Sequence, residues 1–232
     1  MNSVFNQTIE KIEQLIKQVV EMETVNKDIE FQALQAQINP HFLYNVLDTI
    51  NWMARKKGED NICRMVTSIS SLMRASISNK RSMVYIREEI KYVQDYLYIQ
   101  ETRYGDKFTS YIEVDERLNE LEIPKMTIQT LVENAVVHGM EPSLKPCMVR
   151  IRAVKEGEKM CIHVWDNGVG IDTEKLLSLQ TGKAQSKRIG LRNVQERIRI
   201  LYGEGYGLKI DSRQNEFTEV VLTLPVRSED QP

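Results

Sequence analysis

Apolar side chains recur at three- and four-residue spacing through much of the first 104 residues, which is the period of an amphipathic helix. In residues 1–30 they form a narrow seam of Ile9, Ile12, Ile16 and Val19. This spacing indicates a coiled-coil-like signalling helix, and equally suits a solvated helix packed on its own chain. We therefore expect the chain to begin with a helical stalk.

The helical repeat continues over residues 31–104 and predicts three further helices, ending near residues 55, 78 and 104. The first two are joined by a short polar turn around Gly58, so they form an antiparallel hairpin. A hairpin alone cannot cover two broad apolar stripes. Either a second copy covers them, which gives a four-helix bundle in a homodimer, or the rest of the same chain does.

From residue 105 the pattern changes to short alternating runs, which are typical of strands, mixed with two helices. The expected strands are 108–114, 147–154, 160–166, 207–211 and 218–225, and the expected helices are 126–137 and 191–201. We predict an α+β protein in which a helical region precedes a two-layer α/β sandwich with a largely antiparallel sheet. The predicted segments are a helical stalk (1–30), a helical dimerisation region (31–104), an α/β domain (105–227) and a disordered tail (228–232).

The stretch 35–45 interrupts the helical pattern with Pro40, which is followed directly by His41. An interior proline kinks or restarts a helix, Asn39 can cap the restart, and Pro40 suits its first position. His41 would lie roughly 80–100° from the centre of the apolar stripe, where a partner can reach it. Asn45 would lie beside it on the same face. Imidazole is a good nucleophile near neutral pH, so His41 is a candidate phosphoryl acceptor.

Residues 133–139 place polar side chains near the end of a predicted helix. Thr130, Asn134 and His138 are spaced by four and share one helical face. An asparagine amide oxygen is a suitable ligand for Mg²⁺, which commonly joins protein oxygens to phosphate oxygens. Asn134 is therefore a candidate metal ligand.

Two glycine-containing segments follow. In residues 166–170, Asp166 ends a strand and can accept a hydrogen bond from an exocyclic amine, while the glycines let the backbone approach a flat ring. In residues 189–193 a glycine leads into a helix whose free N–H groups can meet phosphate. The candidate contacts there are Gly190, Leu191, Arg192 and Asn193. Each segment alone fits a turn or a helix start, but all three in this order indicate a nucleotide site.

The composition of this 232-residue chain argues against several classes of protein. A net charge of −2 gives no basic field for nucleic acid, and 41% hydrophobic with 28% charged residues is ordinary for a soluble protein. No apolar run approaches the ~20 residues that span a bilayer, so we expect no membrane segment here and a cytoplasmic location. The three cysteines show no metal or redox spacing, which suits reduced thiols.

The three polar and glycine segments resemble the N, G1 and G2 boxes of the ATP-binding fold shared by DNA gyrase, the 90-kilodalton heat-shock chaperone, histidine kinases and the MutL mismatch-repair protein. The stretch 35–45 resembles the histidine box of the autolysin-sensor type of sensor histidine kinase. The likeness covers roughly residues 30–226. It implies a two-component kinase that uses ATP and Mg²⁺ to phosphorylate His41 and passes the phosphoryl group to a response-regulator aspartate. It also implies an upstream transmembrane sensor in the full-length protein.

By the same resemblance, Asn134 binds Mg²⁺, Asp166 contacts the adenine amine, and the loop 173–189 forms the ATP lid. Glycines of the second and third boxes shape the pocket and lid: Gly168, Gly170 and Gly190. Arg188 departs from the family pattern, in which a glycine usually stands two positions before Gly190. This departure keeps open a degenerate nucleotide-binding module that acts by protein contact.

The candidate general base is not fixed by sequence. Better-known histidine kinases carry an acid directly after the histidine, where this chain has Phe42. We rank Glu133 first because it adjoins the metal ligand, and Asp48 or no base at all stays open; the candidate catalytic residues are His41, Asn45 and Glu133. Hydrolytic members of the fold place a glutamate four residues before the asparagine, whereas this chain has Thr130, a poor base for activating water. Kinase activity is therefore favoured over an ATP hydrolase that drives conformational change, with a serine kinase of the anti-sigma type last.

Overall fold

A computed structural model describes residues 40–77, 82–143, 145–172 and 189–226 of the chain. The expected stalk, the Asn39 cap, Arg188, most of the expected lid and the C-terminal tail lie outside the described residues. The chain divides into two units, Met1–Thr49 and Ile50–Pro232.

Helix α2 (Pro40–Lys57) has Pro40 as its first described residue, and the fixed φ of proline suits the first helical position. It ends at Lys57 and is followed by Gly58, whose φ of +73° belongs to the left-handed region. Helix α3 (Asp60–Ile77) follows at once, and the thiol of Cys63 donates to the backbone oxygen of Asn51 at 3.8 Å. The expected pair of helices joined by a short turn is therefore present.

Five strands form the main sheet of the second unit in the order β2-β4-β5-β7-β6. Their bounds are β2 Phe108–Val114, β4 Cys147–Glu156, β5 Lys159–Asp166, β6 Gly207–Arg213 and β7 Phe217–Pro225. Only β2 and β4 pair in parallel within this sheet, and the other three pairings are antiparallel. The prediction of a largely antiparallel sheet after a helical region is confirmed.

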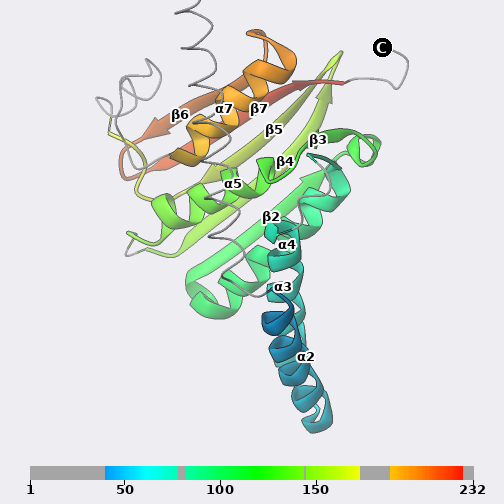
Figure 1. The fold of residues 1–232 in the computed structure, drawn as a ribbon. Coiled ribbons are helices and arrows are strands. Elements are labelled where there is room, and N and C mark those ends of the chain that lie inside the picture. Colours follow the sequence, from blue (N-terminus) through cyan, green and yellow to red (C-terminus); the bar gives the residue numbers. More distant parts are fainter. Residues whose placement is uncertain (1–39, 78–81, 144, 173–188, 227–232) are drawn as a thin grey trace, which may run out of the picture. The chain divides into compact units, whose positions relative to one another are not determined.

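Helices α4 (Ile86–Tyr104), α5 (Thr127–Asn134) and α7 (Ile189–Tyr202) cover one face of this sheet (Figure 1). Alternate strand residues point into the layer between helices and sheet, so Ile151, Ile162 and Leu222 are fully buried. Burial of such apolar surface is the main term that stabilises a two-layer domain. Apolar side chains of the three helices complete the same core, among them Val93, Leu131 and Ile198.

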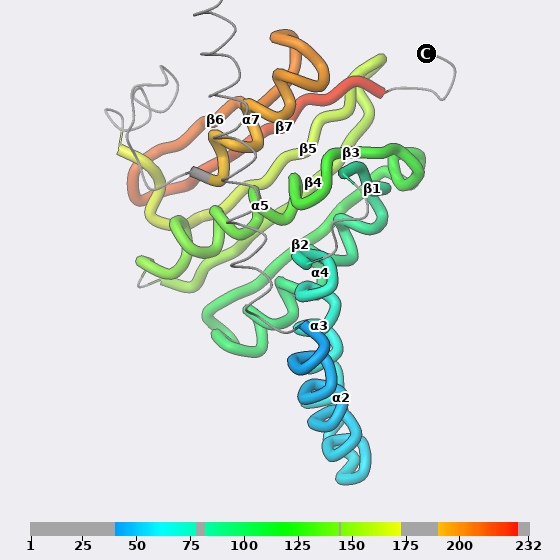
Figure 2. Tube along the Cα trace, viewed as in Figure 1, coloured from blue at the N-terminus to red at the C-terminus, as the bar shows by residue number. Residues whose placement is uncertain are grey.

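Two short strands, β1 (Met83–Tyr85) and β3 (Glu122–Pro124), form a separate antiparallel pair. β1 leads directly into α4, and β3 lies just before α5, so the pair joins the beginnings of these two helices (Figure 2). Short 3₁₀ turns flank β2, and α5 continues into a π-helical segment, η3 (Ala135–Met140). Among the described residues, no helix combines the length and the apolar character that a bilayer-spanning segment needs.

Candidate functional site

A small, partly open cavity lies between the helical layer and the sheet. Four of the residues predicted for the nucleotide site line it: Asn134, His138, Asp166 and Leu191. They come from the end of α5, the π-helical segment, the end of β5 and the beginning of α7. The structure therefore gathers residues that are up to 57 positions apart in sequence, from Asn134 to Leu191, around one space.

Asn134 is oriented by its own helix. Its side-chain nitrogen donates to the backbone oxygen of Thr130 at 2.7 Å, so the amide oxygen is the end that can serve as a ligand. The α-helix predicted to run to residue 137 instead becomes π-helical from Ala135 to Met140. The wider turn keeps Asn134 and His138 on the cavity and ends at Met140. Such π-helical turns are frequent at functional sites.

The π-helical segment and the loop after β5 lie in very close backbone contact. Asp166 is 3% exposed, and its Oδ1 accepts a hydrogen bond from Gly168 N at 3.0 Å. A Cβ on Gly139 would lie 2.3 Å from Asp166 Oδ1, and a Cβ on Gly168 would lie 2.1 Å from the Gly139 oxygen. Val169 N also donates to that oxygen at 2.9 Å. Both glycines are therefore needed to hold the Asp166 carboxylate against the cavity.

Gly170 and Gly190 do not line the cavity, but each allows a close approach beside it. Gly170 has φ +63°, and a Cβ there would lie 2.1 Å from the backbone oxygen of Arg213, so this loop rests on the β6–β7 hairpin. At Gly190 a Cβ would come within 3.1 Å of the Thr130 methyl group. The Thr130 hydroxyl donates to the backbone oxygen of Met126, which leaves its methyl group toward the beginning of α7.

Besides Gly168, Gly170 and Gly190, three predicted residues of the second unit do not line the cavity. Glu133 accepts a hydrogen bond from the Gln129 side chain at 2.8 Å, along its own helix. Burial, and secondarily the charge of Glu133, raises the pKa of Tyr96 on α4, which indicates that the Glu133 carboxylate is near α4. Arg192 pairs with Glu196 at 3.0 Å on the exposed side of α7, and Asn193 is exposed too.

Several cavity residues were not predicted. Thr218 is buried, lies directly opposite Asp166 in the β5–β7 register, and its hydroxyl is 3.0 Å from that of Ser212. Apolar side chains from the strands and the loop after β5 complete the wall, including Val164, Ile171, Ile210 and Val220. The period-two alternation of β6 and β7 could have identified the inward-facing members of this set. It could not have indicated which of them face the cavity.

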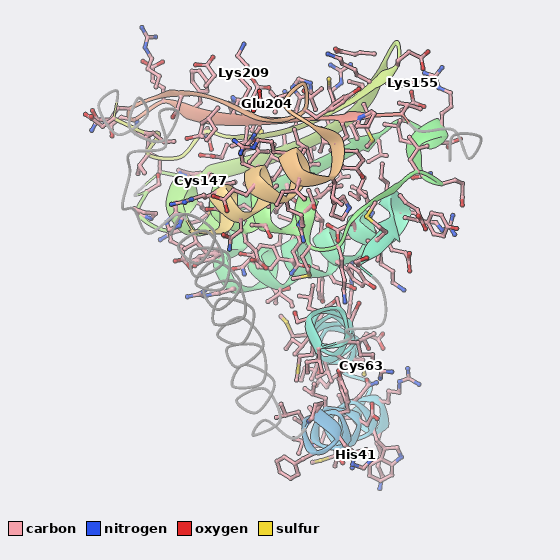
Figure 3. All side chains as sticks on the ribbon, turned by 45° about the horizontal axis from the view of Figure 1, so that its top comes forward. His41, Cys63, Cys147, Lys155, Glu204 and Lys209 are labelled. Carbon is pink, nitrogen blue, oxygen red and sulfur yellow. The ribbon has the colours of Figure 1, made fainter. Side chains whose placement is uncertain are left out.

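His41 belongs to the first unit and lies in the first turn of α2, with its side chain exposed (Figure 3). The side-chain nitrogen of Asn45 is 3.3 Å from His41 Nδ1, as the four-residue spacing predicts. The ring is not enclosed by the helix that carries it, so it is open to a reaction partner.

Two family descriptions match separate parts of the chain. Residues 29–108 match the family described as "Histidine kinase", and residues 121–228 match "Histidine kinase-, DNA gyrase B-, and HSP90-like ATPase". The sensor histidine kinase YesM of Bacillus subtilis is 41% identical over 99% of this chain and 39% of its own length. The sensor histidine kinase YpdA of Escherichia coli is 36% identical over 88% of this chain and 35% of its own length. The sensor protein LytS of B. subtilis is 31% identical over 87% of this chain and 34% of its own length.

The chain thus spans less than two fifths of the length of these curated relatives. Among solved structures, the histidine kinase domain from Erythrobacter litoralis EL346 gives a TM-score of 0.47 at 16% identity, with 80% of this chain and 96% of that chain covered. The sequence comparisons match the segments that carry the histidine box and the three nucleotide-site segments.

Proposed function

This chain belongs to the sensor histidine kinases, and we propose that it transfers the γ-phosphoryl group of ATP to His41 and then to an aspartate of a response regulator. The observation that carries the proposal is the convergence of Asn134, His138 and Asp166 on one cavity, in a chain that also exposes His41. The cavity supports nucleotide binding, and the exposed imidazole supplies an acceptor.

Asp166 is the residue that we propose binds the adenine base. Its carboxylate can accept a hydrogen bond from the exocyclic amine, and its burial shields that bond from competing water. Asn134 would offer its amide oxygen to Mg²⁺, which would neutralise charge on the phosphates. In the described part of the chain no three acidic, His or Cys side chains group to hold a metal by themselves, which suits an ion shared with the nucleotide.

A kinase is favoured over a hydrolase by the side chain at position 130. A hydrolytic enzyme needs a base beside the phosphates that can activate water. The Thr130 hydroxyl is a weak base, and it already donates to the Met126 backbone oxygen. Water attack is therefore slow, and the phosphoryl group is kept for a better nucleophile.

The proposed step is an in-line attack of His41 Nε2 on the γ-phosphorus. The N–P bond forms while the bond to the bridging oxygen breaks, and ADP leaves with the electron pair. Asn45 is a positioning residue, because its side-chain amide adjoins His41 Nδ1. When the amide is rotated by 180°, Asn45 Oδ1 accepts a hydrogen bond from His41 Nδ1–H. This bond favours the tautomer in which His41 Nε2 carries the lone pair. Glu133 is our proposed acceptor of the proton that the ring then releases, once its carboxylate leaves Gln129.

We also propose that the chain acts as a homodimer. Large apolar side chains on α2 and α3 are exposed in the single chain, among them Ile50, Met53 and Ile62. Such a set is unusual on a monomer and suits a bundle formed with a second copy. The proposed setting is the cytoplasmic, signal-output part of a membrane sensor, because relatives named sensor kinases are more than twice as long.

The test is phosphoryl labelling, and it uses another histidine of the chain as its control. With γ-³²P-labelled ATP, His41→Ala should bind nucleotide but take up no label, because the acceptor nitrogen is gone. His163→Ala changes an outer-face histidine that is 3.0 Å from Glu219 and should be labelled like the wild type. The label on wild type should be lost in acid, as a phosphoramidate is. Label on His41→Ala would refute the assignment, and steady phosphate release without labelling would favour a hydrolase.

A further inference from the structure

Glu89 on α4 is fully buried, although it does not line the cavity. Its carboxylate accepts hydrogen bonds from three backbone N–H groups at the start of α5: Oε1 from Met126 at 2.5 Å, and Oε2 from Ile128 at 2.9 Å and Gln129 at 3.4 Å. Glu89 thus binds the N-terminus of α5 in the way that helix N-termini bind anions, with the acid supplied by another helix.

The guanidinium group of Arg197, on a third helix, also binds the start of α5. Arg197 of α7 donates to the Lys125 backbone oxygen at 2.9 Å and to the Thr127 hydroxyl at 2.8 Å. Burial raises the pKa of Glu89, while the three N–H groups and the charge of Arg197 act in the opposite direction. The start of α5 is therefore bound by α4 and by α7 together.

Other contacts link α4 to the residues before α5 and to the residues after the π-helical segment. The β1–β3 pair joins the chain before α4 to the chain before α5. Beyond the π-helical segment, Glu141 accepts hydrogen bonds from the Tyr104 hydroxyl at 2.8 Å and from Arg103 at 3.3 Å. The contacts of Glu141 are exposed, so they contribute less than the buried contacts of Glu89.

We propose that Glu89 and Arg197 are positioning residues for the nucleotide site, through which α4 sets the placement of α5 and α7 around the cavity. The proposal rests on the proposed function, because it assigns a role in binding ATP at this cavity. A displacement of α4 moves the N-terminus of α5, and with it Asn134, His138 and Gly139. Since Gly139 holds Asp166 by close contact, the adenine contact moves as well.

The test is Glu89→Gln, which exchanges one acceptor oxygen for an NH₂ group that faces backbone donors. The dissociation constant of a fluorescent ATP analogue should rise roughly tenfold, at a temperature where circular dichroism shows the variant folded. Amides of Met126, Ile128 and Gln129 should also exchange faster. Asp95→Asn is the matched control: it makes the same acid-to-amide change on α4, but Asp95 accepts from Ser68 of α3 at 2.9 Å. Its nucleotide affinity should equal that of wild type.

A merely structural role for Glu89 predicts a lower melting temperature with unchanged affinity in the folded protein, and that result would overturn the proposal. Equal losses of affinity in Glu89→Gln and Asp95→Asn would also overturn it, since any loosening of α4 would then suffice. If Glu89→Gln does not fold, Arg197→Gln takes its place, with the same expected rise and the same contradicting result. Failure of the wild-type chain to bind nucleotide would instead refute the proposed function.

Discussion

The absence of a side chain at Gly139 allows Asp166 to occupy its position. Because a Cβ there would lie 2.3 Å from the Asp166 oxygen, Gly139→Ala must displace the carboxylate. Loss of the one hydrogen bond that a charged carboxylate accepts from the adenine amine costs about 1.5–3 kcal/mol, which is roughly a 10- to 150-fold rise in the dissociation constant for ATP. Isothermal titration with a non-hydrolysable ATP analogue measures this directly.

The matched control is Gly205→Ala, because a Cβ at Gly205 meets nothing within 4 Å. It should bind the analogue like the wild type and unfold at a similar temperature. If Gly139→Ala also bound normally, the carboxylate of Asp166 would not be the adenine contact, and the site would have to be reassigned.

Single residues were predictable where their chemistry is local. Asn134 and Asp166 line the cavity as expected, because each ends a helix or a strand whose period is visible in sequence. Arg192 and Asn193 lie on the exposed side of α7, and their expected contact with phosphate stays a prediction. Thr218 was missed because its role depends on facing Asp166 across two strands, which is a matter of register.

At the scale of elements, long periodic segments were predicted well and short ones were not. The five strands of the main sheet appear within a few residues of their expected bounds, because alternation over seven or more residues is distinctive. β1 and β3 have three residues each, too few to show a period. The π-helical turn also has no periodic signature, since it differs from an α-helix by one residue in one turn.

Helix α7 offers a comparison of two isoleucines in one element. Ile198 is fully buried in the core, whereas Ile200 is 82% exposed. Ile198→Ala should lower the free energy of unfolding by about 2–5 kcal/mol, since it removes buried methyl groups and leaves a cavity. Ile200→Ala should change it by no more than about 0.5 kcal/mol. Urea unfolding followed by circular dichroism measures both, and equal effects would contradict the packing of α7 on the sheet.

At the scale of the whole molecule, α4 connects two predicted regions. The sequence assigns it to the helical region, and its apolar face packs in the core of the sheet domain through Ile86, Ile90, Val93 and Leu97. The same helix contacts α3 through Asp95 and Ser68. Periodicity alone could predict that α4 is a helix, but which layer it joins depends on tertiary packing. The division at residue 104 accordingly stays a prediction.

The exposed apolar side chains of α2 lead to a prediction about assembly. Ile50 and Met53 are 40% and 53% exposed and lie three residues apart, on one helical face. In a symmetric dimer the pair is buried twice. Because each side chain is only about half exposed in the single chain, each contributes about half of the ~1.5–3 kcal/mol of complete burial, or about 3–6 kcal/mol for the four. A double variant, Ile50→Glu with Met53→Glu, should therefore convert the protein from dimer to monomer in light scattering at micromolar concentration.

Arg55→Glu is the control for the added charge, because Arg55 is exposed on the opposite side of the same helix. It should leave the mass at twice that of one chain. A double variant that stays dimeric would place the interface on another surface, and a monomeric wild type would leave this apolar face to a different partner. Nucleotide binding should persist in the double variant, since every residue that lines the cavity comes from the sheet domain of one chain. Loss of dimer and loss of nucleotide binding are thus separable measurements on the same protein.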